Sequence, residues 1–307
     1  MESISFHIHP VPPFRLDLTA WALRRRRDNI VDRWEEGCYR RALVVDGATL
    51  DLSIAQRGGT ASPELEVTVT GSRLADTSLE SVAAATERLL GTRVDLTSFY
   101  RLAGKDARVA NLAERFMGLK PPCFPSVFEA LVNAMACQQI SLTVGILMLN
   151  RLSITYGPRI GPQNAPVFAF PRPEDLALLA PPALCHLGFS RRKATAMIAL
   201  ACSCCDGSVD LERLGTLPDS EVVSRLGKLQ GVGRWSAEYT LLRGLGRLHA
   251  FPADDVGARD NLKEWLGIDG KIDRDKALKL VAPWGKYAGF LYFHLLLQKL
   301  SEAGLLS

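Results

Sequence analysis

The sequence predicts an α+β protein in which an amino-terminal antiparallel β-sheet with helices precedes an all-α core of two lobes. Alternating apolar and polar residues mark several strands within the first hundred positions, whereas helical spacing of apolar residues dominates from about residue 106 onward. Loops rich in proline and glycine interrupt the second part at 120–125, 156–173 and 267–271. We therefore divide the chain into an amino-terminal domain, residues 1–105, and a helical core, residues 106–307.

The amino-terminal domain is expected to contain a β-hairpin. Residues 41–45 and 49–54 are strand-like and flank Asp46-Gly47, a pair typical of a two-residue turn. Residues 65–70 alternate as a further strand, and residues 80–90 follow with the spacing of an amphipathic helix. This order of elements predicts a small sheet covered by helices.

Four consecutive arginines, residues 24–27, could contact nucleic-acid phosphates or form a solvated helix face. Acidic residues follow at positions 28, 32, 35 and 36 and balance the tract, so we expect the solvated face.

The net charge of the chain is only +4. Residues 113–307 hold 22 basic and 18 acidic side chains, whereas residues 1–112 hold 15 of each. The excess therefore lies in the helical core, where it fits a local DNA-binding patch.

The composition, 47% hydrophobic and 23% charged, is that of a soluble globular protein. No apolar run is long enough to cross a membrane, and the start Met1-Glu2-Ser3-Ile4 lacks a secretory pattern. We therefore expect an intracellular protein without a membrane partner, in the cytoplasm and nucleoid or in a nucleus.

The seven cysteines are expected to be reduced. Residues 202–205 contain one Cys-x-x-Cys spacing without the second pair that a zinc site needs, so helix cysteines are expected there.

The stretch around residues 219–244 has the pattern of two helices joined by a tight glycine turn. Asp219 or Ser220 can cap the first helix, whose apolar residues recur at helical spacing up to Leu229. Gly231 and Gly233 then supply backbone angles that are closed to other residues. A second apolar helix follows Arg234 and runs to Gly244.

Such a turn can bind DNA through its backbone. Amides at the entrance to a helix can hold a phosphate, and these contacts do not read sequence. The carbonyls of Leu229 and Gly231 could also hold a structural Na⁺ or K⁺ ion. An ordinary helix–turn–helix corner is the alternative interpretation. The expected DNA contacts from this segment are Gln230, Gly231, Gly233, Arg234 and Ser236.

Two adjacent carboxylates, Asp254 and Asp255, precede the next predicted helix, which begins near Val256. Acids at this position commonly cap a helix. Capping leaves one carboxylate oxygen free, so Asp255 can cap the helix and take part in chemistry.

Four sequence blocks together resemble the helix-hairpin-helix DNA glycosylase superfamily, in particular its 3-methyladenine DNA glycosylase II branch. The resemblance implies that Asp255 is the catalytic residue at the floor of a cleft between two helical lobes. It also implies that the partner is duplex DNA with a damaged base, bound by a monomer. The blocks are the glycine turn with Phe251-Pro252-Ala253-Asp254-Asp255, residues 128–141, residues 170–176 with 187–194, and Pro283-Trp284-Gly285-Lys286-Tyr287-Ala288.

The resemblance also assigns a base pocket and two further DNA contacts. Trp235 and Tyr239 lie four residues apart and share a helix face, and Trp284 comes from the last block. We expect these three aromatic side chains to hold a flipped, positively charged base, although hydrophobic core is their usual fate. Gln138 and Gln139 are expected to contact DNA. Gln139 stands where the best-known bacterial member has a leucine that fills the gap left by the flipped base.

These assignments imply a monofunctional glycosylase of base excision repair that hydrolyses the N-glycosidic bond of alkylated purines and leaves an abasic site. Asp255 would stabilise positive charge on the sugar and orient the attacking water. Trp235 stands where the bifunctional branch has a Schiff-base lysine, and no cysteine follows Cys205, so we expect no lyase step, no iron–sulfur cluster and no required cofactor. A glycosylase for oxidised or deaminated bases, and a non-catalytic DNA-binding protein, stay open as alternatives.

Overall fold

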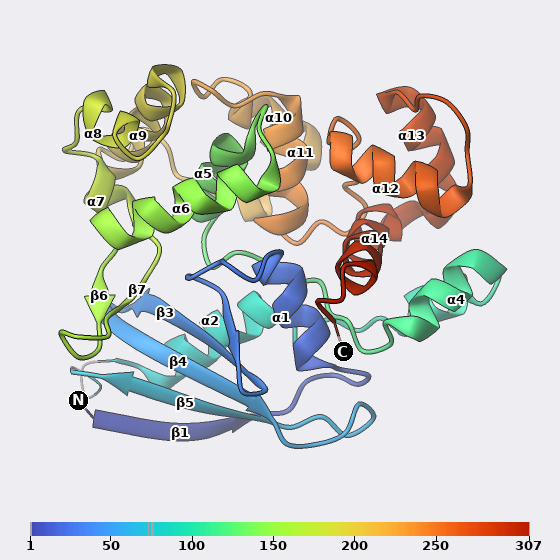
Figure 1. Cartoon of the computed structure of the whole chain (residues 1–307), viewed down its shortest axis with the longest axis horizontal. Coiled ribbons are helices and arrows are strands. Elements are labelled where there is room, and N and C mark those ends of the chain that lie inside the picture. The colour runs from blue at the N-terminus through green and yellow to red at the C-terminus, as the bar shows by residue number, and fades with distance from the viewer. Residues whose placement is uncertain (1, 73, 75–76, 307) are drawn as a thin grey trace.

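An antiparallel sheet of five strands forms one side of the molecule in the computed structural model, which describes residues 2–72, 74 and 77–306 (Figure 1). The strand order is β1-β5-β4-β3-β2. The predicted hairpin is confirmed, because β3 and β4 are joined at Asp46 and Gly47, which take φ angles of 50° and 75°. The strands are β1 (Glu2–Ile8), β2 (Arg33–Glu35), β3 (Cys38–Val45), β4 (Ala48–Gln56) and β5 (Leu65–Gly71).

Two helices cover the apolar face of this sheet. Alternate residues of β4 and β5 are buried, as the period of two requires, and they pack with residues of α1 (Leu16–Arg24) and α2 (Leu79–Leu90). The predicted helix at 80–90 is thereby confirmed. The larger core of the helical part also includes Trp21 of α1 and Phe99 of α3 (Thr97–Ala103), so the sheet domain and the helices share α1.

Helix α5 (Val127–Cys137) lies at the centre of the helical part. Every residue from 127 to 136 is buried, which fits a helix that is largely apolar on all sides. The remaining helices are α3 (Thr97–Ala103), α4 (Ala107–Arg115), α6 (Leu142–Tyr156), α7 (Pro173–Leu176), α8 (Pro181–Cys185), α9 (Arg191–Cys205), α10 (Asp219–Leu226), α11 (Arg234–Arg243), α12 (Val256–Leu266), α13 (Arg274–Val281) and α14 (Ala288–Glu302). The loop 156–173 contains a short pair of strands, β6 (Arg159–Ile160) and β7 (Val167–Phe168), that the sequence did not predict.

The arginine tract corrects one prediction. Helix α1 ends at Arg24, and Arg25 takes a left-handed conformation with φ of 61°. The guanidinium of Arg24 donates to the carbonyls of Arg26 and Trp34, and Arg24 and Arg25 are both buried. The expected solvated face is therefore wrong for these two residues, because packing of the loop after α1 overrides the local charge pattern.

Helix α10 corrects a smaller detail. It begins at Asp219, and Pro218 occupies the N-cap without a side-chain hydrogen bond. The carboxylate of Asp219 instead pairs with His249 and lies 3.7 Å from Arg247 Nε. No described helix is both long and apolar enough to traverse a lipid bilayer.

Candidate active site

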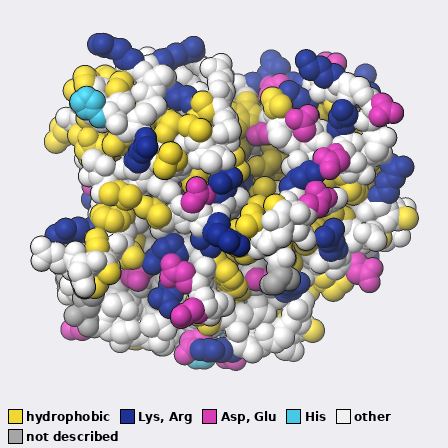
Figure 2. Space-filling model, viewed as in Figure 1, with side chains coloured by type: hydrophobic (Ala, Val, Ile, Leu, Met, Phe, Trp, Pro, Cys, Tyr) yellow, Lys and Arg dark blue, Asp and Glu magenta, His cyan; other side chains and the backbone are white. Residues whose placement is uncertain are grey.

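A cleft of about 1070 Å³ opens between two groups of helices. One wall comes from the turn after α5, the start of α9 and the glycine turn before α11, and the other comes from the start of α12 and from α14. Figure 2 shows a hollow with apolar side chains between these two parts of the surface. The predicted groove between two helical lobes is thus present, and Asp255 is among the residues that line it.

Asp255 is held by two hydrogen bonds. It is the N-cap of α12, where its Oδ1 accepts from the backbone N–H of Ala258 at 2.8 Å. Its Oδ2 accepts from the indole N–H of Trp235 at 2.9 Å. The half-buried carboxylate therefore caps its helix and also lines the cleft, and its catalytic role stays a prediction.

The aromatic pair on α11 supports this carboxylate. The ring centroids of Trp235 and Tyr239 lie 5.5 Å apart, as expected for residues on one helix face. Trp235 is half-buried and Tyr239 is only 3% exposed, and both side chains line the cleft. Tyr292 of α14, which the sequence analysis missed, lines the opposite wall. Burial and the nearby charge of Asp255 raise the pKa of Tyr292, so its phenol stays neutral.

The structure does not bring Trp284 to the cleft. Its side chain is 6% exposed and its ring centroid lies 5.4 Å from that of Trp265. A break at Gly285, with φ of 48°, interrupts the 3₁₀ segment Ala282–Tyr287 that carries it. Packing against Trp265 therefore holds this side chain in the core, away from the residues that line the cleft.

The glycine turn matches the prediction at Gly231, whereas Gly233 has extended angles, φ of −97° and ψ of −179°, that any residue can adopt. Gly231 is left-handed with φ of 79°, and Gly233 is the N-cap of α11. Gln138 joins this turn to α5, because its Nε2 donates to the carbonyl of Gly231 at 2.9 Å and to Ser236 Oγ at 2.7 Å. Gln138 and Ser236 thus stabilise the turn through hydrogen bonds on its inner side. Gln230, Gly233 and Arg234 are exposed.

The two carbonyls expected to hold a cation already accept hydrogen bonds. The carbonyl of Gly231 accepts from Gln138, and that of Leu229 accepts from the backbone N–H of Val232 at 3.1 Å. Each oxygen keeps a second lone pair for an ion. Among the described residues, no group of His, Cys, Asp and Glu is arranged to hold a metal.

Gln139 lies at the mouth of the cleft. It is exposed and left-handed, with φ of 56°, in the turn between α5 and α6. Lys193 fixes this turn, because its Nζ donates to the carbonyls of Ala136 and Gln138 at 2.8 and 2.7 Å. Partial burial lowers the pKa of Lys193. The sequence block that contains Lys193 matched the superfamily, but only the folded chain shows its bonding role.

A family model, described as HhH-GPD superfamily base excision DNA repair protein, matches residues 132–286, which include the glycine turn and Asp255. This chain belongs to the HhH-GPD superfamily. The match begins within α5 and ends just before Tyr287. It therefore includes most residues that line the cleft, but not those of α14.

Relatives within the HhH-GPD superfamily carry related names. The DNA-3-methyladenine glycosylase of Bacillus subtilis is 30% identical over 201 residues, which are 66% of this chain and 66% of that protein. The DNA-3-methyladenine glycosylase 2 of Escherichia coli is 32% identical over 139 residues, or 45% of this chain and 48% of that protein. The chain thus matches just under two thirds of the length of the Bacillus subtilis protein and about half of the length of the Escherichia coli protein.

Solved structures extend the likeness beyond the segment that the family model matches. The 3-methyladenine DNA glycosylase of Archaeoglobus fulgidus has a TM-score of 0.82 at 25% identity, covering 95% of this chain and 97% of that one. The 8-oxoguanine glycosylase/lyase of Clostridium acetobutylicum in its apo form has a TM-score of 0.72 at 18% identity, which shows the shared fold alone. The amino-terminal sheet and the helical core are therefore arranged as in these proteins.

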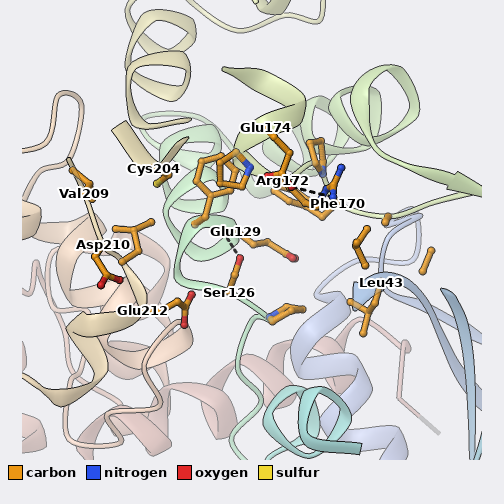
Figure 3. Close-up of a pocket in the computed structure, with 18 of the residues that line it drawn as sticks. Leu43, Ser126, Glu129, Phe170, Arg172, Glu174, Cys204, Val209, Asp210 and Glu212 are labelled. Carbon is orange, nitrogen blue, oxygen red and sulfur yellow. Dashed lines mark hydrogen bonds and ion pairs between the residues drawn. The ribbon is translucent and has the colours of Figure 1, made fainter. Parts of the chain in front are cut away.

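A second cavity of about 640 Å³ lies where the sheet meets the HhH-GPD helices, and it shares no lining residue with the cleft. Figure 3 shows Glu129 and Ser126 at the start of α5, and Leu43 on β3, among the side chains that line this cavity. The buried guanidinium of Arg41 also lines it. Arg41 donates to Glu129 and to Asp32, both at 2.6 Å, so an ionic cluster joins the sheet to α5.

Proposed function

We propose that this protein is a monofunctional DNA glycosylase that removes alkylated purines of the 3-methyladenine type from duplex DNA. The observation that carries the proposal is the carboxylate of Asp255, which is oriented by Trp235 and Ala258 and faces a cleft beside an exposed glycine turn. The names of the Bacillus subtilis and Escherichia coli relatives support the same substrate class.

The geometry suggests how the reaction proceeds. A damaged nucleotide must leave the duplex to reach Asp255, so the base enters the cleft beside Trp235 while Gln139 occupies the vacated place. The bond between C1′ and the base nitrogen breaks with both electrons going to the base. Asp255 stabilises the positive charge on the sugar and orients a water molecule. The water oxygen bonds to C1′, its proton is released, and an abasic site results.

The DNA contacts of the proposal are independent of sequence. Exposed backbone at Gln230, Gly233 and Arg234 would hold the phosphates of the strand that carries the lesion. A Na⁺ or K⁺ ion on the carbonyls of Leu229 and Gly231 would stiffen this turn without taking part in the chemistry. We propose that the protein acts as a monomer and needs no other cofactor, in whichever compartment holds the DNA, cytoplasm with nucleoid or nucleus.

A lyase-type enzyme for oxidised bases is less well supported. Such enzymes need a free amine beside the sugar. Lys193 is the one lysine among the described residues that line the cleft, and its amine already donates to two carbonyls at the end of α5. The 8-oxoguanine glycosylase neighbour shares the fold at 18% identity.

Duplex DNA treated with a methylating agent tests the proposal. The wild-type protein should release free 3-methyladenine or 7-methylguanine, and Asp255→Asn should release them about a hundredfold more slowly while still binding abasic DNA. Asp254→Asn is the matched control. Asp254 is adjacent in sequence, but its Oδ2 lies 3.5 Å from Arg274 Nε, and it does not accept the hydrogen bond from Trp235. Equal rates for wild type and Asp255→Asn, or covalent DNA trapped by borohydride, would refute the monofunctional mechanism.

A further inference from the structure

A guanidinium that comes from the sheet domain, directly after α1, lines the cleft. Arg25 directly follows α1, is only 4% exposed and lines the cleft together with Trp235 and Asp255. Its Nη1 donates to the hydroxyl of Tyr239 at 3.0 Å, and its Nη2 donates to Asn133 Oδ1 at 2.7 Å. Its Nε has no partner among the described residues.

The charge of Arg25 is not neutralised by a bonded carboxylate. Its two hydrogen-bond partners are a phenol and an amide, and neither carries a charge. Asp32 and Glu129 are the buried carboxylates of the described chain, and both are bonded to Arg41. A second buried guanidinium, that of Arg243, lies 5.7 Å from the ring centroid of Tyr239 and adds to the positive field.

A fixed cation at this place distinguishes two kinds of damaged base. A purine alkylated at N3 or N7 is already cationic in DNA and leaves as a neutral molecule. A neutral purine lesion leaves with both electrons of the glycosidic bond as an anion, which then takes a proton from water. The guanidinium opposes entry of the first kind and stabilises the departure of the second.

We propose that Arg25 is a specificity-determining residue that lowers kcat/KM for cationic damaged bases relative to neutral ones. This inference rests on the proposed function, since it concerns the base that enters the same cleft.

Two oligonucleotide duplexes test the proposal, one with 7-methylguanine and one with hypoxanthine at the same position. Arg25→Met removes the charge and should raise the ratio of kcat/KM for 7-methylguanine to that for hypoxanthine by about tenfold. Arg25→Lys keeps the charge and should keep the wild-type ratio, even where both rates fall. A merely structural role of Arg25 predicts equal losses on both substrates, and that result would overturn the proposal.

A second variant keeps the test decisive if Arg25→Met does not fold. Asn133→Asp places a carboxylate on the oxygen that now lies 2.7 Å from Arg25 Nη2, so it neutralises the guanidinium in place. The ratio should rise in the same direction, and an unchanged ratio in the folded variant would overturn the proposal. Release of neither base by the wild-type protein would instead refute the proposed function, whatever the role of Arg25.

Discussion

Asp255 and Asp254 are neighbours in sequence with different electrostatic surroundings. The carboxylate of Asp254 lies 3.5 Å from Arg274, which also pairs with Glu238. Asp255 has no ion-pair partner among the described residues and receives only neutral N–H donors. No cation of the described residues therefore forms an ion pair with Asp255, whereas Arg274 partly compensates the charge of Asp254.

The indole of Trp235 should contribute to the rate through this hydrogen bond. Trp235→Phe keeps an aromatic ring in the cleft but frees Oδ2 of Asp255, and we expect kcat to fall about tenfold, the value of one charge-assisted hydrogen bond. Single-turnover kinetics on methylated duplex DNA measure it. Trp265→Phe is the matched control, because Trp265 packs against Trp284 and does not line the cleft. Equal kcat values for both variants would show that the indole does not orient the carboxylate.

At the scale of elements, sequence patterns predicted the helices and turns whose conformation depends on neighbouring residues. The Asp46-Gly47 hairpin, the glycine turn and helix α11 all follow from residues next to one another in sequence. Arg25 and Trp284 were misplaced because contacts distant in sequence decide them. Arg25 is held by partners more than a hundred residues away, and Trp284 turns toward Trp265 after the break at Gly285.

The glycine turn offers a direct test of its own geometry. Gly231 is left-handed, and an added Cβ would lie 2.6 Å from the side chain of Ala196. Gly231→Ala should therefore lower the free energy of unfolding by about 1–3 kcal/mol and weaken DNA binding. Gly233→Ala is the control for stability alone, since its φ is −97° and an added Cβ meets nothing within 4 Å. Urea unfolding and a DNA titration measure both effects. Equal stability of the two variants would contradict the assigned conformation of the turn.

Across the whole molecule, a continuous series of contacts joins the sheet to the cleft. Arg41 of β3 bonds Glu129 of α5, and one turn later Asn133 donates to the carbonyl of Glu129 and accepts from Arg25. Arg25 in turn donates to Tyr239, which packs against Trp235. The sheet domain is therefore part of the structure that positions the site, although it lies outside the matched family segment.

A buried histidine makes the stability of the molecule depend on pH. His294 of α14 is 1% exposed, and burial lowers its pKa from 6.5 to about 4 despite its bond to the carbonyl of Phe290. Between these values the unfolded chain binds more protons than the native one. Stability should therefore be fully present above pH 6.5 and fall by about 3 kcal/mol as the pH drops toward 4. Urea unfolding at several pH values measures this, and His294→Leu should remove that part of the slope. The same slope in both proteins would contradict it.

The ionic cluster at the second cavity joins the sheet to α5. Of the ion pairs considered, it should contribute most to the free energy of unfolding. Arg41 is 0% exposed and holds Asp32 and Glu129, while Tyr39 also donates to Asp32. Burial alone would raise the pKa of Asp32, but the charge of Arg41 and these hydrogen bonds lower it, so the carboxylate stays ionised.

Arg41→Met leaves two carboxylates buried without their cation, and the free energy of unfolding should fall by about 3–5 kcal/mol. The control is Arg225→Met, because the pair of Arg225 with Glu221 is exposed on one helix and contributes less than about 1 kcal/mol. Chemical denaturation of both variants measures the difference. A loss for Arg41→Met as small as that of the control would mean that apolar packing alone holds the sheet against α5.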